Sequence, residues 1–168
     1  HAAVGSALAE IHPEIRRIDG TQHIYLNKED VSEEIRLPEI SMAASAVSAI
    51  PAVRAALLDL QRNMAKTNNV IMDGRDIGTV VLPDATVKIF LTAAPEIRAK
   101  RRYDELCAKG VQTTFEEVLS DLNTRDYNDS HRETAPLKQA DDAVLADTSE
   151  LDFERSCELV CNIIKEKL

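Results

Sequence analysis

The order of strand-like and helix-like segments after residue 68 decides the fold class of this chain. Three short apolar runs are typical of strands: 69–73 (NVIMD), 86–93 (TVKIFLTA) and 142–148 (DAVLADT). The apolar residues of 86–93 are continuous, which predicts that this strand is buried on both faces. Strands that alternate with helices predict right-handed βαβ units and a parallel sheet, so we expect an α/β fold. The predicted helices are residues 95–110, 113–131 and 151–168.

The first 67 residues have a different pattern, which predicts a smaller lobe. Two β-rich runs within residues 14–27 flank Asp19-Gly20, a dipeptide that strongly favours a hairpin turn. Helices are expected over residues 37–50 and 51–66, and a proline at the first turn of the second helix is tolerated. The expected regions are residues 1–67 and 68–168.

The charge of the chain limits its partners. The 168 residues carry a net charge of −9, so polyanions such as nucleic acids and anionic membranes are not expected to bind. No run approaches the roughly 18 apolar residues of a membrane span, and no secretion signal is visible. Cys157 and Cys161 share a helix face and are expected as buried structural thiols, which together with Cys107 fit a reducing cytoplasm.

A turn with the sequence GRDIG (74–78) follows the first expected strand. Ligands of open α/β sheets bind at the carboxyl ends of the strands, where glycines allow a sharp turn or a close approach to a ligand. Arg75 offers a planar fork for phosphate or carboxylate, and Asp76 accepts hydrogen bonds from an amine or a hydroxyl. An ion pair on a tight turn explains the same two residues about equally well.

Two arginine-rich segments favour the ligand interpretation. The segments RAKRRYDE and RDYNDSHR concentrate arginine in an acidic chain, and Arg125 and Asp129 are one helical turn apart. Solvated helix faces account for most charge runs, but this concentration is typical of a site for a multiply charged anion such as a phosphate chain. The residues concerned are Arg98, Lys100, Arg101, Arg102, Arg125, Asp126, Asp129 and Arg132.

Five stretches of the chain together resemble bacterial cytidylate kinase. They occur in the family's order, and DGRDIGTVVLPDA is long and characteristic. The resemblance implies a P-loop nucleoside monophosphate kinase fold, with an acceptor-nucleotide lobe (1–67), a partial kinase core (68–168) and an arginine-rich lid (about 98–132). The stretches are EDVSEEIR (29–36), AASAVSAIPAVRAALLDLQR (43–62), DGRDIGTVVLPDATVKIFLTA (73–93), RAKRRYDEL (98–106) and RDYNDSHRETAPL (125–137).

The resemblance also implies a reaction and its partners. The family transfers the γ-phosphoryl group of ATP to CMP or dCMP, with Mg²⁺ at the donor site. The partners implied are small nucleotides, and a monomer is implied for the full-length protein. Ser45 and Asp76 resemble the residues that recognise the cytosine ring, and Arg54 and Arg75 resemble the clamp on the acceptor phosphate.

Five further residues resemble the family's ribose and lid positions. Asp129 and Arg132 correspond to a ribose-binding pair. Arg101, Arg102 and Arg125 resemble arginines of the lid that reach the transferring phosphate, where they stabilise the charge of the transition state. No metal ligand is assigned in this chain.

One family feature is missing from the 168 residues. No glycine begins the motif G-x-x-x-x-G-K-[ST], which holds the donor phosphates. The resemblance places the segment with this loop before residue 1, and whether that segment is deleted or precedes the given sequence stays open. If it is deleted, we expect ATP to bind weakly or not at all, and the neighbours of the missing strand to expose apolar edges. Two alternatives are a non-catalytic nucleotide-binding or interaction module and a kinase for another base.

Overall fold

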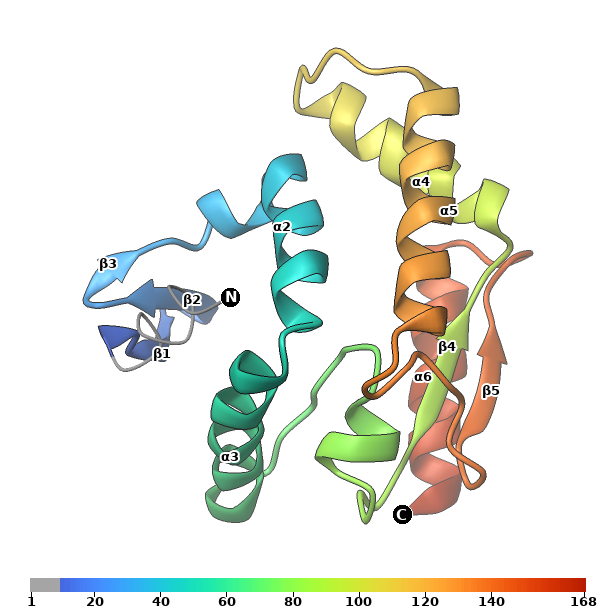
Figure 1. Cartoon of the computed structure of the whole chain (residues 1–168). Coiled ribbons are helices and arrows are strands. Elements are labelled where there is room, and N and C mark those ends of the chain that lie inside the picture. Colours follow the sequence, from blue (N-terminus) through green and yellow to red (C-terminus); the bar gives the residue numbers. More distant parts are fainter. Residues whose placement is uncertain (1–9) are drawn as a thin grey trace. The chain divides into compact units, whose positions relative to one another are not determined.

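The computed structural model describes residues 10–168, without the side chains of residues 38, 39, 41 and 42. The chain divides into two compact units, the first ending at Asn69 and the second spanning Val70–Leu168 (Figure 1).

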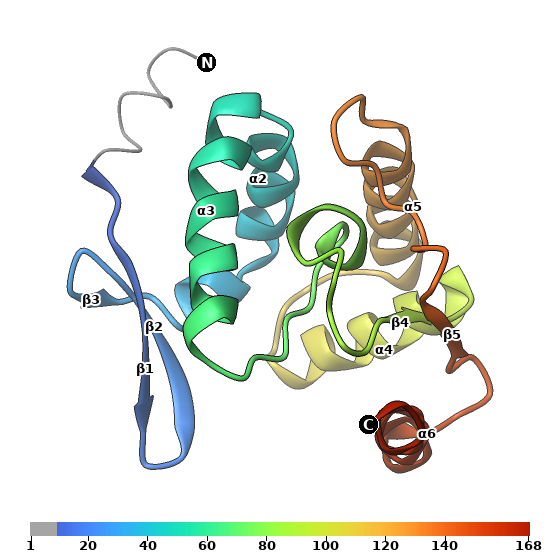
Figure 2. The ribbon, with the colours of Figure 1, turned by 90° about the horizontal axis from the view of Figure 1, so that it is seen from below.

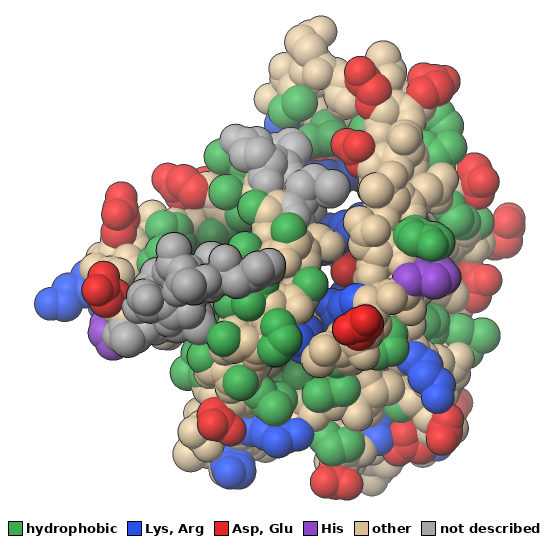
Figure 3. All heavy atoms as spheres, in the orientation of Figure 1, with side chains coloured by type: hydrophobic (Ala, Val, Ile, Leu, Met, Phe, Trp, Pro, Cys, Tyr) green, Lys and Arg blue, Asp and Glu red, His purple; other side chains and the backbone are tan. Residues whose placement is uncertain are grey.

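Acidic side chains are spread widely over the face seen in Figure 3. From residue 10 onward, no helix has both the length and the apolarity needed to cross a membrane.

The first unit contains an antiparallel sheet (Figure 2). Strands β1 (Pro13–Ile18) and β2 (Thr21–Leu26) pair along their whole length, and β2 also pairs with the short β3 (Glu29–Asp30). Asp19 and Gly20 form the turn with φ of 50° and 81°, and two positive values are what a tight hairpin turn of type I′ requires. The predicted hairpin is confirmed.

The Asp30 side chain forms several hydrogen bonds at the end of this sheet. Its carboxylate accepts hydrogen bonds from the Ser32 hydroxyl and from the Ser32 amide (3.0 Å), and it pairs with His23 Nδ1 at 2.7 Å. The Ser32 Oγ in turn accepts a bond from the Ile24 amide at 2.9 Å. These bonds, led by that from the Ser32 hydroxyl, lower the pKa of Asp30 to about 2.

Acid should therefore loosen the hairpin in a defined pH window. Because the pKa of Asp30 is lower in the folded chain, its contribution to stability is complete above the unfolded pKa of about 3.9 and disappears as the pH falls toward 2. In an NMR titration, the Ser32 amide should shift with a midpoint near 2, and Asp30→Asn should abolish this transition. A midpoint near 4 would contradict the proposed bonding.

Two helices complete the first unit after a short 3₁₀ turn, η2 (Glu34–Arg36). Helices α2 (Pro38–Ser48) and α3 (Pro51–Thr67) each begin with a proline, and the extended Ile50 separates them. Both helices were predicted from the sequence, with ends that differ by no more than two residues. Val53 of α3 is buried.

The second unit contains two parallel strands with helices around them. Strands β4 (Ile89–Thr92) and β5 (Val144–Asp147) pair in register from Ile89↔Val144 to Thr92↔Asp147, which confirms the predicted parallel sheet. Helix α6 (Phe153–Lys167) runs along one face of this pair (Figures 1 and 2).

Two local sequence signals determine where helix α4 (Pro95–Ala108) ends and where helix α5 (Phe115–His131) begins. Gly110 (φ 76°) ends α4 as predicted: its amide bonds to the Cys107 carbonyl, and the next amide bonds to the Leu106 carbonyl, as in a Schellman motif. Thr114 then caps α5 through a reciprocal capping box with Glu117. The two helices share a small core formed by Ala99, Leu106 and Val118, with Tyr103, Phe115 and Leu119 around it.

Two strand predictions require correction. Residues 69–73 are not a strand, and Ile71 is 96% exposed. Leu91 of β4 is 60% exposed, although the apolar run predicted burial on both faces. The physical reason is the same in both cases: an apolar run is buried only where another element covers it, and in the described chain β4 pairs with β5 alone.

The prediction that Cys157 and Cys161 are buried is also wrong, because both are exposed. Cys157 and Cys161 do share one face of α6. The buried face of that helix is a different one, centred on Ile163. Spacing alone established that the two thiols are neighbours but not which side of the helix meets the sheet.

Candidate functional site: an arginine–aspartate cluster

The GRDIG turn continues into a single π-helical turn, η3 (Ile77–Val81). The amides of Val80 and Val81 donate to the Asp76 carbonyl at 2.9 and 3.2 Å, which fixes the backbone at Asp76. Isolated π turns are rare and frequently mark functional sites. Neither glycine of the turn has a positive φ; instead, a Cβ on Gly74 would come within 2.8 Å of the Ile77 side chain. Packing therefore explains Gly74 better than an unusual backbone angle.

The structure gathers five of the predicted site residues into one arginine–aspartate cluster. Arg75 Nε donates to Asp129 at 2.9 Å, and these two residues are 54 positions apart. Arg132 lies between the two carboxylates, 3.5 Å from Asp76 and 3.9 Å from Asp129, and Arg125 Nε lies 3.8 Å from Asp129. The turn is therefore paired with α5 and its C-terminal end. The cluster consists of Arg75, Asp76, Arg125, Asp129 and Arg132.

The two carboxylates of the cluster are buried, and the cluster as a whole has more positive than negative side chains. Asp76 and Asp129 are 9% and 3% exposed, and three guanidinium groups face these two carboxylates. Burial, followed by the nearby charge of Arg75, lowers the pKa of Arg125. A cation that is desolvated beside another cation is stabilised by an incoming anion, so the arrangement favours phosphate or carboxylate ligands.

The two predicted lid arginines on α4 have other contacts. The Arg101 guanidinium donates to the backbone carbonyls of Thr148 (2.6 Å) and Leu151 (2.9 Å), which ties α4 to the segment after β5. Arg102 pairs with Glu105 on its own helix at 2.8 Å.

Ser45 and Arg54 belong to the first unit. Ser45 is on α2, and its carbonyl accepts a hydrogen bond from the Ser48 hydroxyl at 2.9 Å. Arg54 is on α3, and its Nη1 donates to the Ser48 carbonyl at 3.2 Å. Within this unit, the Arg54 side chain therefore lies at the C-terminal turn of α2.

Arg98 has a structural connection that the sequence did not assign to it. Its Nε donates to the Ala93 carbonyl at 2.8 Å, and its Nη1 donates to Asp126 at 2.6 Å. One signal was available: no acidic residue stands three or four positions from Arg98 on its helix, so a partner had to come from elsewhere.

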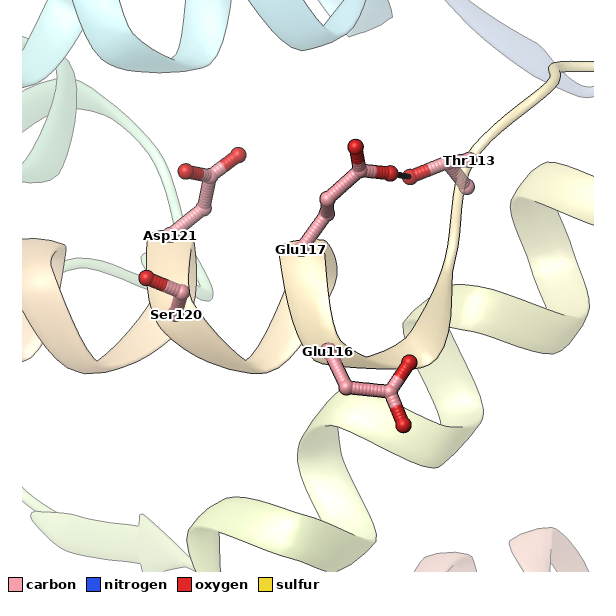
Figure 4. Close-up of a pocket in the computed structure, with 5 residues that line it drawn as sticks. All are labelled: Thr113, Glu116, Glu117, Ser120 and Asp121. Carbon is pink, nitrogen blue, oxygen red and sulfur yellow. Dashed lines mark hydrogen bonds between the residues drawn. The ribbon is translucent and has the colours of Figure 1, made fainter.

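An open pocket at the start of α5 offers a different chemistry (Figure 4). Glu117 points toward Thr113 and accepts a hydrogen bond from the Thr114 amide at 2.8 Å, the main cause of the lowered pKa of Glu117. The carboxylates of the pocket repel phosphate, and Glu117 is already used in the helix cap. We therefore exclude this pocket as the anion site. Its lining residues are Thr113, Glu116, Glu117, Ser120 and Asp121.

The residues present do not fit a donor site for ATP and Mg²⁺. The sequence contains no G-x-x-x-x-G-K-[ST] loop. In addition, residues 10–168 as described include no group of three His, Cys, Asp or Glu side chains arranged to hold a metal ion.

Parallel strands with helices around them define an α/β fold, and the arginine–aspartate cluster is the candidate site on this fold. Comparison with known proteins is more specific. The family model for cytidylate kinase matches residues 3–166. Cytidylate kinase of Thermosipho melanesiensis is 52% identical over 145 residues, 86% of this chain and 67% of the relative. The Lactobacillus johnsonii enzyme is 47% identical over 154 residues, 92% of this chain and 67% of the relative.

A third relative, cytidylate kinase of Clostridium botulinum, is 49% identical over 143 residues, 85% of this chain and 66% of the relative. The chain thus spans about two thirds of the length of these relatives. It belongs to the cytidylate kinase family, whose members are nucleoside monophosphate kinases with a P-loop fold.

Proposed function

We propose that this chain forms the acceptor-nucleotide part of a kinase that transfers the γ-phosphoryl group of ATP to CMP or dCMP, giving CDP or dCDP. The observation that carries the proposal is the arginine–aspartate cluster, because its surplus positive charge suits a nucleoside monophosphate. The proposed partners are small nucleotides, the proposed compartment is the cytoplasm, and the full-length protein is proposed to be a monomer.

The roles proposed for the acceptor site are those that the family resemblance implies, and the chemistry of the side chains suits them. Arg75 of the second unit is proposed to bind the acceptor phosphate, since guanidinium groups bind phosphate through paired hydrogen bonds. The resemblance implies the same role for Arg54 of the first unit. Asp76 and Ser45 recognise the cytosine ring, where a carboxylate accepts from the exocyclic amine. In this scheme the first unit is the acceptor-nucleotide lobe.

Ribose and the transferring phosphate are assigned to the α4–α5 region. Asp129 and Arg132 hold the ribose from the end of α5. Arg125 stabilises the transferring phosphate, and its burial beside Arg75 supports this assignment. Arg101 and Arg102, within the proposed lid at about residues 98–132, take part once they leave their contacts with the 148–151 backbone and with Glu105.

Calorimetric titration with CMP and cytidine tests the proposal directly. CMP should bind far more tightly than cytidine, because the phosphate supplies the contacts with the cluster, and UMP should bind more weakly than CMP. Equal binding of CMP and cytidine would overturn the proposal. A parallel turnover assay with CMP and ATP, on protein whose intact mass has been measured, separates a kinase from a binding module, since a module binds CMP without turnover.

A further inference from the structure

Arg98 connects three elements of the second unit through one side chain. It lies on the first turn of α4 and donates to the Ala93 carbonyl at the end of β4 (2.8 Å) and to Asp126 of α5 (2.6 Å). The Arg98 and Asp126 side chains are about one third and one quarter exposed, so the contact is partly shielded from solvent. Such a charge-assisted bond is stronger than a neutral one.

The position of this contact on α5 is informative. The apolar cluster between α4 and α5 draws its α5 members from the first five residues of that helix, Phe115, Val118 and Leu119. Asp129 lies ten residues beyond Leu119, about 15 Å along the helix axis. Asp126, in contrast, is adjacent to Arg125 and three positions before Asp129.

We infer that Arg98 is a positioning residue for the acceptor site. Through Asp126, it fixes the C-terminal half of α5 against the end of β4. It thereby orients Arg125 and Asp129, to which the proposed function gives the transferring phosphate and the ribose. Asp129 passes this constraint on to Arg75, whose Nε it binds. The inference rests on the proposed function in one respect, the choice of CMP as the ligand in the binding test.

Asp126→Asn distinguishes positioning from simple electrostatics, because the two make opposite predictions. Removing this carboxylate makes the region more positive, so Coulomb attraction alone would tighten CMP binding. If Asp126 instead positions α5, its removal weakens CMP binding. We expect CMP to bind about tenfold more weakly to Asp126→Asn and to Arg98→Met, and the double variant to be no worse than either, as for residues that act through one contact. Arg98→Lys keeps the charge beside Asp126 but not both bonds of the guanidinium group, so it should recover part of the affinity.

A second measurement decides the inference without any nucleotide. The Nε–H signal of Arg75 in a ¹H–¹⁵N spectrum reports its bond to Asp129, and it should shift in Asp126→Asn and in Arg98→Met. Asp104→Asn is the matched control on α4, since it removes only an exposed pair with Lys100 and should change neither readout. Unchanged or tighter CMP binding by Asp126→Asn, with an unmoved Arg75 signal, would overturn the inference. Absence of CMP binding by the unaltered protein would overturn the proposed function, while the Arg75 signal would still decide positioning.

Discussion

Arg132→Met should lower the free energy of unfolding of the second unit by about 3 kcal/mol, the lower end of the range for removing one partner of a buried ion pair. The Arg132 side chain is 10% exposed and lies between two carboxylates that are 11% and 5% exposed. Its Nε also donates to the Ala135 carbonyl at 2.6 Å. The lower end applies because the ion-pair distances, 3.5 and 3.9 Å, are long. Urea denaturation followed by circular dichroism measures the change.

Two further variants make this result interpretable. Arg155→Met removes an arginine on α6 that is 70% exposed and 3.9 Å from Asp152, so its stability should change by no more than about 0.5 kcal/mol. Arg132→Lys keeps the charge but not the planar fork, and should recover part of the loss. A loss below about 1 kcal/mol in Arg132→Met would show that Asp76 and Asp129 are stabilised without it.

Arg75→Met should weaken CMP binding about 100-fold, or about 2.7 kcal/mol, and leave cytidine binding nearly unchanged. Asp129 binds the Nε edge of Arg75 at 2.9 Å and thereby orients the terminal amino groups that suit a phosphate. Cytidine has no phosphate, so it does not use this contact. Titration calorimetry with the two ligands measures the difference.

The control for this experiment is again Arg155→Met, which also removes one positive charge but lies on α6. Its affinity for CMP should match that of the unaltered protein. If Arg75→Met weakened cytidine and CMP equally, Arg75 would act by holding the cluster together, and the proposed phosphate contact would be wrong.

Local signals in the sequence were sufficient for most helices and turns. The Asp19-Gly20 hairpin, the prolines that open α2 and α3, the Gly110 stop and the Thr114 cap each depend on residues within one turn of chain. The prediction of a strand over residues 69–73 was wrong because strand formation does not depend on local residues alone. A strand is stabilised by a neighbour that can be far away in sequence, and the apolar character of the run does not supply one.

The cluster was predicted in part. The sequence placed Arg75 and Asp76 together on one turn, and it placed Arg125 and Asp129 one helical turn apart. It could not predict that Arg75 pairs with Asp129, because only the tertiary fold joins residues 54 positions apart. The same limit applies to Arg98, whose partner Asp126 is 28 positions away on another helix.

The surplus charge of the cluster also affects how fast a nucleotide arrives. A chain with net charge −9 repels an anionic nucleotide at long range, whereas three arginines against two aspartates attract it at short range. At physiological salt, interactions beyond about 8 Å are largely screened, so the local attraction dominates the encounter. Dilute buffer restores the long-range repulsion, and the association rate then rises with added salt, the reverse of ordinary electrostatic steering.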